Sequence, residues 1–276
     1  NLLREYSTIV FTNGVSPFTF LWSNGATTED ISNLPPGTYS VSVTDNNGCI
    51  ATLSTEIFAF DCSSPVWIWA KQNDGTAEDI AKSIACDDNG NVYATGHFSG
   101  TATFGGISLI STGGTDVFVA KYDSDGNTIW ALQANGANNQ YCEDIAIDAA
   151  NNIYITGYFY NSISFDGNLL SNSGGSDIFI AKFDDQGAYQ WAQKAGGSGN
   201  DISNSIAIDQ SNNAYICGNF QNIANFGFSN ITSNGSEDIF IAKYNSLGNL
   251  QWVIDEGGAF NDAANEITIG ISNNII

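Results

Sequence analysis

Basic residues, methionine and long apolar runs are scarce or absent in this chain. Of its 276 residues, 7 are Lys or Arg and 29 are Asp or Glu, and the formal net charge is -22. So acidic a chain repels nucleic acid and anionic membrane surfaces, and neither is an expected partner. No apolar run approaches the roughly 20 residues that span a bilayer, so no membrane span is expected. Because the chain lacks Met and begins at Asn1, we interpret it as an excerpt of a longer polypeptide.

Histidine and arginine occur once each, as His97 and Arg4. General acid–base and triad chemistry depend on histidine, and the clamping of a carboxylate substrate depends on clustered arginines. The five cysteines show no zinc-binding spacing. The sequence therefore predicts a protein that is not an enzyme and that needs no cofactor.

The chain does contain a repeat with a period of 61 residues. The segment DIFIAK occupies residues 177–182 and returns at 238–243, and DVFVAK occupies residues 116–121. The same spacing relates Trp69, Trp130, Trp191 and Trp252, then Lys121, Lys182 and Lys243, and also Gly96, Gly157 and Gly218. So many residues in register, with 42% hydrophobic residues, indicate a packed repeat protein rather than a disordered one.

Each period is predicted to supply four strands as two hairpins. One hairpin turn reads DDNG, DAAN or DQSN, and its first residue can accept backbone N–H groups; these residues are Asp87, Asp148 and Asp209. A second turn reads DSDG, DDQG or NSLG. Four-stranded units in series predict an all-β fold, a multi-bladed β-propeller of which about 3.5 blades are present. A parallel β-helix is the alternative, but it has shorter rungs and no repeated hairpin turns.

The segments GGSGNDISNSIAIDQSNNAYICGNF and DIFIAKYNSLGNLQW resemble the SBBP-type β-propeller repeat of large bacterial surface proteins. The resemblance covers about residues 66–276. It departs at Gln140, which stands where residues 79, 201 and 262 are Asp, and at Gly270, which replaces the turn Asp. The segment VWIWAKQ, residues 66–72, matches only the last strand of a period. We expect it to complete the final blade of a ring whose further blades follow Ile276.

The first sixty residues do not share the period. The segment TYSVSVT alternates, and turn signals occur at SNG, LPPG and DNNG, which predicts a small β-sandwich of the immunoglobulin or PKD kind over residues 1–58. Residues 59–65 form the predicted linker, and residues 66–276 the propeller. The stretch from about 19 to 55, with WSNGATT, LPPGTY and GC, resembles the SprB-type repeat of gliding adhesins from Bacteroidetes.

Three of the seven basic residues share one repeated position, namely Lys121, Lys182 and Lys243. We predict that each lysine pairs with a repeated acid rather than with a ligand, the candidates being Asp79, Asp201 and Asp262. Carboxylates are numerous enough for a glycosidase pair, but most occupy repeated positions, whereas a catalytic pair should break the repeat. Gly96, Gly157 and Gly218, each inside a strand, predict a bulge or a close approach of two backbones.

Cysteines and acids raise three further hypotheses. Cys86, Cys142 and Cys217 exchange with small or apolar residues in other repeats, which predicts buried positions. A disulfide between Cys49 and Cys62 suits an extracellular protein, and a partner cysteine outside the sequence is the alternative. The segment DSDGN, residues 123–127, resembles the start of a calcium loop, but its copies lose the alternate acid. We expect this segment to act as a hairpin turn, and weak calcium binding at the surface is the alternative.

The two resemblances imply a secreted or cell-surface adhesin-like protein, connected with gliding motility and type IX secretion in Bacteroidetes. Sandwich repeats would form a stalk, and the propeller would display a binding platform for an extracellular glycan or protein ligand. The alternative is a structural subunit of an extracellular filament, sheath or surface layer, whose partners are neighbouring subunits. A polysaccharide-acting enzyme ranks third.

Overall fold

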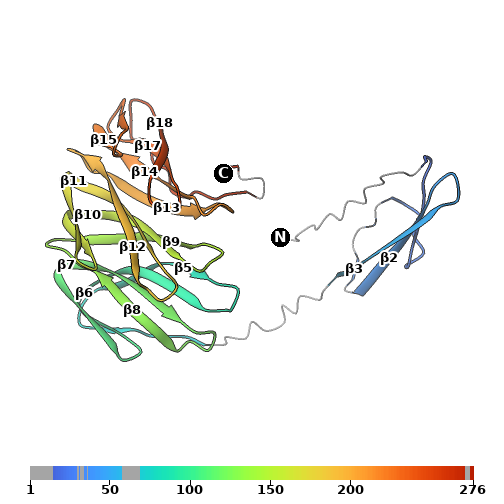
Figure 1. The fold of residues 1–276 in the computed structure, drawn as a ribbon, viewed down its shortest axis with the longest axis horizontal. Coiled ribbons are helices and arrows are strands. Elements are labelled where there is room, and N and C mark those ends of the chain that lie inside the picture. Colours follow the sequence, from blue (N-terminus) through green and yellow to red (C-terminus); the bar gives the residue numbers. More distant parts are fainter. Residues whose placement is uncertain (1–14, 30, 32–33, 36, 58–68, 271–273) are drawn as a thin grey trace. The chain divides into compact units, whose positions relative to one another are not determined.

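The computed structural model describes residues 15–29, 31, 34–35, 37–57, 69–270 and 274–276 (Figure 1). These residues form 18 strands and no helix, which confirms the all-β class. The chain divides into two compact units, Asn1–Trp67 and Ile68–Ile276. The predicted linker, residues 59–65, lies outside the described residues.

The described part of the first unit is one antiparallel sheet. Its order is β1 (Thr19–Trp22), β2 (Gly37–Thr44) and β3 (Ile50–Ile57). Alternation along β2 places Tyr39, Val41 and Val43 on the buried side. The facing sheet of the expected sandwich is not among the described residues, so the two-layer arrangement stays a prediction.

The described part of the second unit contains three antiparallel sheets of five, six and four strands, and each is built on the four strands of one period. The first repeat contains β5 (Asp79–Cys86), β6 (Val92–Phe104), β7 (Ile107–Tyr122) and β8 (Thr128–Ala134). The second contains β9 (Gln140–Ile147), β10 (Ile153–Phe165), β11 (Asn168–Phe183) and β12 (Tyr189–Gly197). The third contains β13 (Ile202–Ile208), β14 (Ala214–Phe220), β17 (Asp238–Tyr244) and β18 (Leu250–Glu256). Figure 1 shows the three sheets following one another from cyan to red, as expected for consecutive blades.

The side chain that begins each repeated turn also holds it. Asp148 Oδ1 accepts the backbone N–H groups of Ala150 and Asn152, each at 2.9 Å, and the Asn152 amide donates to both carboxylate oxygens. Asn151 has a φ of 62°, in the left-handed region that Asn tolerates. The same bonds recur at Asp87 and Asp209, so the predicted turn role of these acids is confirmed.

A long hairpin tip explains why the period exceeds the roughly 40–50 residues of common propeller repeats. We call this tip the arm; it comprises residues 100–111, 161–172 and 222–233. Each arm pairs with the segment that precedes its own repeat. In the first repeat, β4 (Asp74–Gly75) pairs with Thr103 and Ala102, and in the second, Asn135 bridges Ser164. In the third repeat, Gly196 and Gly197 of β12 pair with Asn225 and Ala224 of β15 (Ile223–Asn225). The third arm is completed by β16 (Asn230–Thr232). The arms therefore cover backbone groups that an open strand edge would expose.

The core lies between neighbouring sheets. In β11, Ile178 and Ile180 pack against the third repeat, whereas Phe179 and Ala181 pack against the first. All four side chains are buried. Because both faces of this strand are covered, the segment DIFIAK is apolar at successive positions instead of alternating.

Candidate functional site

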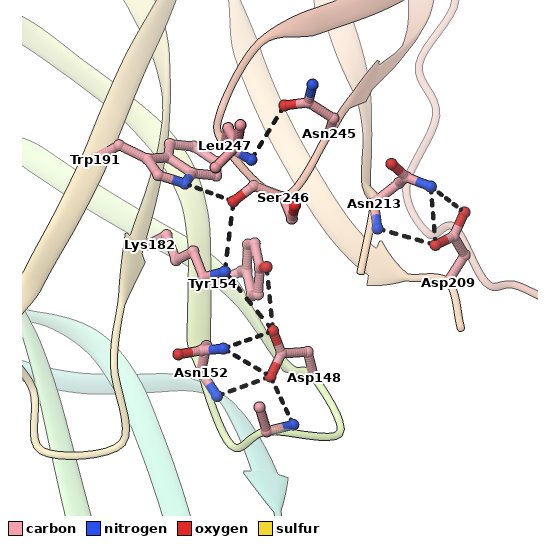
Figure 2. Close-up of polar contacts among 11 residues, drawn as sticks. Asp148, Asn152, Tyr154, Lys182, Trp191, Asp209, Asn213, Asn245, Ser246 and Leu247 are labelled. Carbon is pink, nitrogen blue, oxygen red and sulfur yellow. Dashed lines mark hydrogen bonds and ion pairs between the residues drawn. The ribbon is translucent and has the colours of Figure 1, made fainter. Parts of the chain in front are cut away.

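Each repeat carries the same polar cluster beside its first turn, and we call this cluster the seam. In the second repeat it comprises Asp148, Asn152, Tyr154, Lys182 and Trp191 (Figure 2). Lys182 Nζ lies 3.8 Å from Asp148 Oδ2 and 4.7 Å from the centroid of the Tyr154 ring. The Tyr154 hydroxyl donates to Asp148 Oδ2 at 3.2 Å. Lysines 121 and 243 lie over Tyr93 and Tyr215 in the same way, at 5.0 and 4.7 Å.

The seam also binds the next repeat. Trp191 Nε1 donates to the carbonyl of Ser246 at 3.1 Å, and Lys182 Nζ donates to the same oxygen at 3.4 Å (Figure 2). Trp130 and Lys121 share the carbonyl of Asp185, at 3.3 and 3.1 Å. The repeated lysines and tryptophans therefore join neighbouring sheets, and their polar groups are directed at the protein itself.

The acids predicted to pair with the lysines were the wrong ones. Lys182 pairs with Asp148, and Lys243 with Asp209 at 3.5 Å, both of which are turn acids. The reason is strand register, because Lys182 lies opposite Tyr154, close to the Asp148 turn. Residues 79, 201 and 262 lie at the other end of the first strand. There, Asp201 accepts backbone N–H groups instead.

The two ion pairs differ in how burial acts on the lysine. Burial lowers the pKa of Lys182, and the Asp148 carboxylate opposes this shift. The Lys182 side chain is 11% exposed, against 22% for Lys243. At Lys243 a hydrogen bond with Tyr215 raises the pKa, against a smaller effect of burial. Both ammonium groups are held by a carboxylate and a ring, and that of Lys182 also by a hairpin carbonyl, which suits a structural role.

Two sets of glycines allow close contacts, the first between neighbouring strands of one sheet and the second between neighbouring sheets. The first set, each opposite a bulge in β5, β9 or β13, is Gly96, Gly157 and Gly218. A Cβ at Gly157 would collide with the carbonyl oxygen of Tyr141, so only glycine fits there. In the second set, Gly248 has a φ of 80°, and a Cβ would lie 2.6 Å from the Trp191 ring. This second role is absent from the sequence-based interpretation, which assigned this glycine to the turn alone.

Asp144 is a structural acid that the sequence did not reveal. Its carboxylate accepts the hydroxyl of Ser83 at 2.7 Å and that of Ser205 at 2.8 Å. These serines occupy the equivalent position in the first and third repeats. One side chain therefore ties the first strands of three consecutive sheets together. A signal was present, because Asp144 differs from the serine of its neighbours.

A buried acid precedes the apolar segment of the third strand of each repeat. Asp116 and Asp177 lie within β7 and β11, which begin earlier than the sequence predicted because they include part of the arm, and Asp238 begins β17. Asp177 Oδ2 lies 3.3 Å from Lys194 Nζ, while Oδ1 has no hydrogen-bond partner. Burial raises the pKa of Asp177, and Lys194 opposes this shift. Asp201 is also fully buried, and burial raises its pKa to about 6.

The cysteine predictions have mixed outcomes. Cys142 and Cys217 are buried as expected, and burial raises the pKa of each thiol to about 12. Cys86 is exposed, so its predicted burial is wrong. Its strand, β5, belongs to the first repeat, and in the described part of the chain no earlier four-stranded sheet covers it. Cys49 is exposed and has no disulfide partner among the described residues; Cys62 lies outside them, so the disulfide between the two stays a prediction.

Metal and membrane features are few in the part of the chain that the structure describes. There, no three His, Cys, Asp or Glu side chains form a group that could hold a metal ion. In the calcium-like segment, Asp123 Oδ1 accepts the N–H groups of Asp125 and Asn127, at 3.0 and 2.7 Å, and so caps the turn. No described helix is long and apolar enough to cross a membrane.

One region departs from the repeat. It lies at the arm end of the sheets, the end opposite the Asp turns, and we call Tyr141, Tyr158 and Tyr160 the tyrosine row. The rings of Tyr141 and Tyr158 stack with centroids 4.9 Å apart, and Tyr160 meets Tyr158 edge-on at 6.1 Å. All three are partly exposed. The equivalent positions in the neighbouring repeats hold Ile, His or Asn, and Ser or Gln.

The single histidine supports this row from the first repeat. His97 packs edge-on against Tyr141, with centroids 4.9 Å apart, and is 5% exposed. Burial lowers the pKa of His97 to about 4, with a further contribution from Lys82. The imidazole is therefore neutral at pH 7, which suits a packing role better than acid–base catalysis.

In the third repeat, polar side chains stand in place of Tyr158 and Tyr160, and we call Asn204, Asn219, Gln221 and Glu237 the amide cluster. Gln221 Nε2 donates to Glu237 Oε1 at 2.8 Å, and Asn219 Nδ2 donates to Oε2 at 3.4 Å. Asn204 Nδ2 donates to Asn219 Oδ1 at 3.4 Å. The Glu237 carboxylate is therefore held in one orientation while the residue stays partly exposed. An aromatic platform on one sheet and an oriented carboxylate on the next can together bind a ligand that has both apolar and hydroxyl faces.

Comparison with known families supports the propeller part of the sequence interpretation. Residues 129–158 and 190–219 match the family model described as the SBBP beta-propeller repeat. Each match begins next to a seam tryptophan and crosses the following turn. The first match ends at Tyr158 and the second at Asn219, which occupy equivalent positions at the arm end. The SprB-type resemblance of the first unit is not tested by this match and stays an expectation.

Two curated proteins are similar to this chain over part of their own length. An uncharacterised WD repeat-containing protein of Acanthamoeba polyphaga mimivirus is 33% identical over 187 residues, which cover 59% of this chain and 13% of that protein. The regulatory protein FlaEY of Caulobacter vibrioides is 23% identical over 220 residues, 76% of this chain and 23% of that protein. Among solved structures, a variant of the Synechocystis apocarotenoid oxygenase aligns over 88% of this chain and 68% of its own, at 9% identity and a TM-score of 0.29. So low a score carries no functional argument.

Proposed function

We propose that this protein is a non-catalytic, adhesin-like binding module of a secreted or cell-surface protein. The observation that carries the proposal is the contrast between two ends of the same sheets. The seam repeats in residue type and geometry, whereas the arm end changes from a tyrosine row to an amide cluster. Binding residues are expected where a rigid scaffold varies, and structural residues where it repeats.

Composition supports an extracellular setting for this module. The net charge of -22 and the scarcity of basic residues suit a protein that meets neither nucleic acid nor anionic lipid. The resemblance of the first unit to SprB-type repeats adds a stalk, a Bacteroidetes origin and type IX export to the proposal. In this proposal neither a cofactor nor a metal ion takes part in binding.

Bead adhesion tests the proposal. Fluorescent beads coated with the protein are placed on surfaces that carry plant, algal or bacterial polysaccharides, mucin or collagen. We expect saturable adhesion to at least one surface, competed by soluble protein, with no soluble product released. Absence of adhesion on every surface would overturn the binding function, and release of oligosaccharides would overturn the non-catalytic assignment.

A filament or surface-layer subunit is the second candidate, and the seam favours it. Trp191 and Lys182 both donate to the carbonyl of Ser246 and so join consecutive sheets. In this function, contacts of the same kind would join the sheets of neighbouring subunits in head-to-tail assembly. Negative-stain images that show regular polymers at micromolar concentration would favour this function, and isolated particles would favour the adhesin.

A further inference from the structure

We propose that the tyrosine row and the amide cluster together form a binding site for a neutral oligosaccharide. The inference rests on the proposed binding function and adds the chemical class of the ligand. It is carried by the side chains that break the repeat at the arm end, and by the way the fold holds them.

The tyrosine row supplies a preorganised aromatic platform. Tyr158 lies opposite Tyr141 in the register of β9 and β10, so the backbone ladder fixes their stacking. His97 supports the other side of Tyr141, and Tyr160 closes the row at Tyr158. Tyrosine offers a large amphipathic surface at a low conformational entropy cost. The C–H face of a sugar ring fits such a surface, and the phenol groups provide hydrogen-bonding partners at its edge.

The amide cluster supplies oriented acceptors for sugar hydroxyls. Each oxygen of Glu237 already accepts one amide donor, from Gln221 or from Asn219, and a carboxylate oxygen has a further lone pair. Because the carboxylate is fixed before binding, little side-chain entropy is lost when neighbouring hydroxyls donate to it. This arrangement suits vicinal hydroxyl groups.

Charge favours a neutral ligand over an acidic one. Near the tyrosine row, Lys82 Nζ lies 2.8 Å from Glu143 Oε2, so the basic group there is already paired. The single arginine, Arg4, is far along the sequence from both clusters, and the chain as a whole carries a formal charge of -22. A uronic acid or a sulfated sugar would meet repulsion without a guanidinium partner.

The spacing of the two clusters favours an oligosaccharide over a monosaccharide. The tyrosine row lies on the second repeat, where it contacts His97 of the first, and the amide cluster lies on the third repeat. Neighbouring sheets pack about 10 Å apart, so a ligand that touches both clusters must be longer than one sugar ring. A stable protein interface needs about 20–30 residues on each side, far more than these seven residues supply.

Isothermal titration against neutral hexasaccharides tests the inference. The panel contains cello-, xylo-, laminari-, malto- and chito-hexaose, and the protein is the full chain. The variants take the residues that other repeats have at the same positions, which the fold already accommodates: Tyr158→Asn, Tyr160→Gln and Tyr141→Ile. Glu237→Gln tests the amide cluster. Tyr189→Ala removes a partly exposed tyrosine of β12, outside the row, and serves as the matched control.

We expect at least one hexasaccharide to bind, and Tyr158→Asn and Glu237→Gln each to weaken binding by about tenfold or more. Tyr189→Ala should leave affinity unchanged, and the thermal midpoints of Tyr158→Asn and Glu237→Gln should stay near that of the parent. No binding to any hexasaccharide, with bead adhesion intact, would overturn the inference and leave the proposed function standing. Binding that none of the variants alters would also overturn it, because the sugar would then bind elsewhere. Loss of adhesion to every surface would instead remove the proposed function.

Discussion

Replacement of Lys182 by Met tests whether the seam is a structural joint. Methionine keeps an unbranched apolar side chain but removes the ammonium group. That group contacts the Asp148 carboxylate at 3.8 Å, the Tyr154 ring at 4.7 Å and the carbonyl of Ser246 at 3.4 Å. The first two contacts lie within one repeat, and the third joins it to the next. The substitution should therefore destabilise the sheets without touching the arm end.

The expected loss in the free energy of unfolding depends on how well the groups that contact Lys182 are satisfied after the substitution. Removal of one partner of a buried ion pair destabilises by about 3–5 kcal/mol when the other charge is left bare. Asp148 keeps donors from Ala150, Asn152 and Tyr154, so its charge is not bare. Burial lowers the pKa of Lys182, so desolvation of the ammonium offsets part of the attraction. With about 1 kcal/mol for the lost cation–π contact, we expect a net loss of about 2 kcal/mol.

Urea unfolding followed by tryptophan fluorescence measures this loss, because Trp191 lies in the same seam. Lys82→Met is the matched control: Lys82 pairs with Glu143 at 2.8 Å, but its side chain is 35% exposed, and such pairs contribute about 0–1 kcal/mol. Bead adhesion of Lys182→Met should equal that of the parent at a temperature where both are folded. Equal destabilisation by the two substitutions, or lost adhesion at an unchanged urea midpoint, would refute the structural role.

Three further predictions concern single positions. Burial raises the pKa of Asp201 from 3.8 to about 6. Its protonated form therefore contributes stability that is complete below about pH 4 and lost as the pH rises through 6. Asp201→Gln, which introduces the residue found at position 140, should reduce the fall in melting temperature between about pH 5 and 7, and an identical pH profile would contradict this. Gly157→Ala should lower the free energy of unfolding, measured in urea, by about 3 kcal/mol because the new Cβ meets a backbone carbonyl. Gly258→Ala, where the nearest atom lies 3.8 Å from the new Cβ, should lower it by less than about 1 kcal/mol. Equal losses would contradict the bulge argument. Asp144→Ala should cost about 2 kcal/mol by the same assay because it removes hydrogen bonds to two other repeats, and an unchanged midpoint would show that these bonds are not needed.

Features that depend on a short stretch of chain could be predicted from the sequence. The turn role of Asp148 requires only backbone N–H groups within four residues, and the apolar run of DIFIAK requires only that both faces of one strand be covered. The partner of Lys182 could not be found in this way. All candidate acids share the 61-residue spacing, and only the register of β10 against β11 shows which end of the strand lies beside the lysine.

The arms show a second limit of the local interpretation. The sequence predicted four strands in each period, and it assigned no strand pairing to the arm at residues 161–172. In the structure they extend β10 and β11, and Ser164 bridges to Asn135 before the second repeat begins. A pairing of this kind depends on how two repeats are placed against each other, which no hydrophobic pattern within one repeat encodes. The same reason hid Asp144, whose partners lie 61 residues away on either side.

The tyrosine row left only a weak signal in the sequence. Aligning the chain on its own period places Tyr158 against His97 and Asn219, but many other positions also hold a different residue in each repeat. Positions that keep one residue type in every repeat proved to be turn residues, seam residues and glycines at close backbone contacts, all of which every sheet needs. A position that varies is free of that shared demand, so its residue reflects drift, a ligand or a contact particular to one repeat, as at Asp144. Stacking of Tyr158 on Tyr141, with a third tyrosine beside them, favours the ligand, because drift would not be expected to assemble three tyrosines on one partly exposed surface.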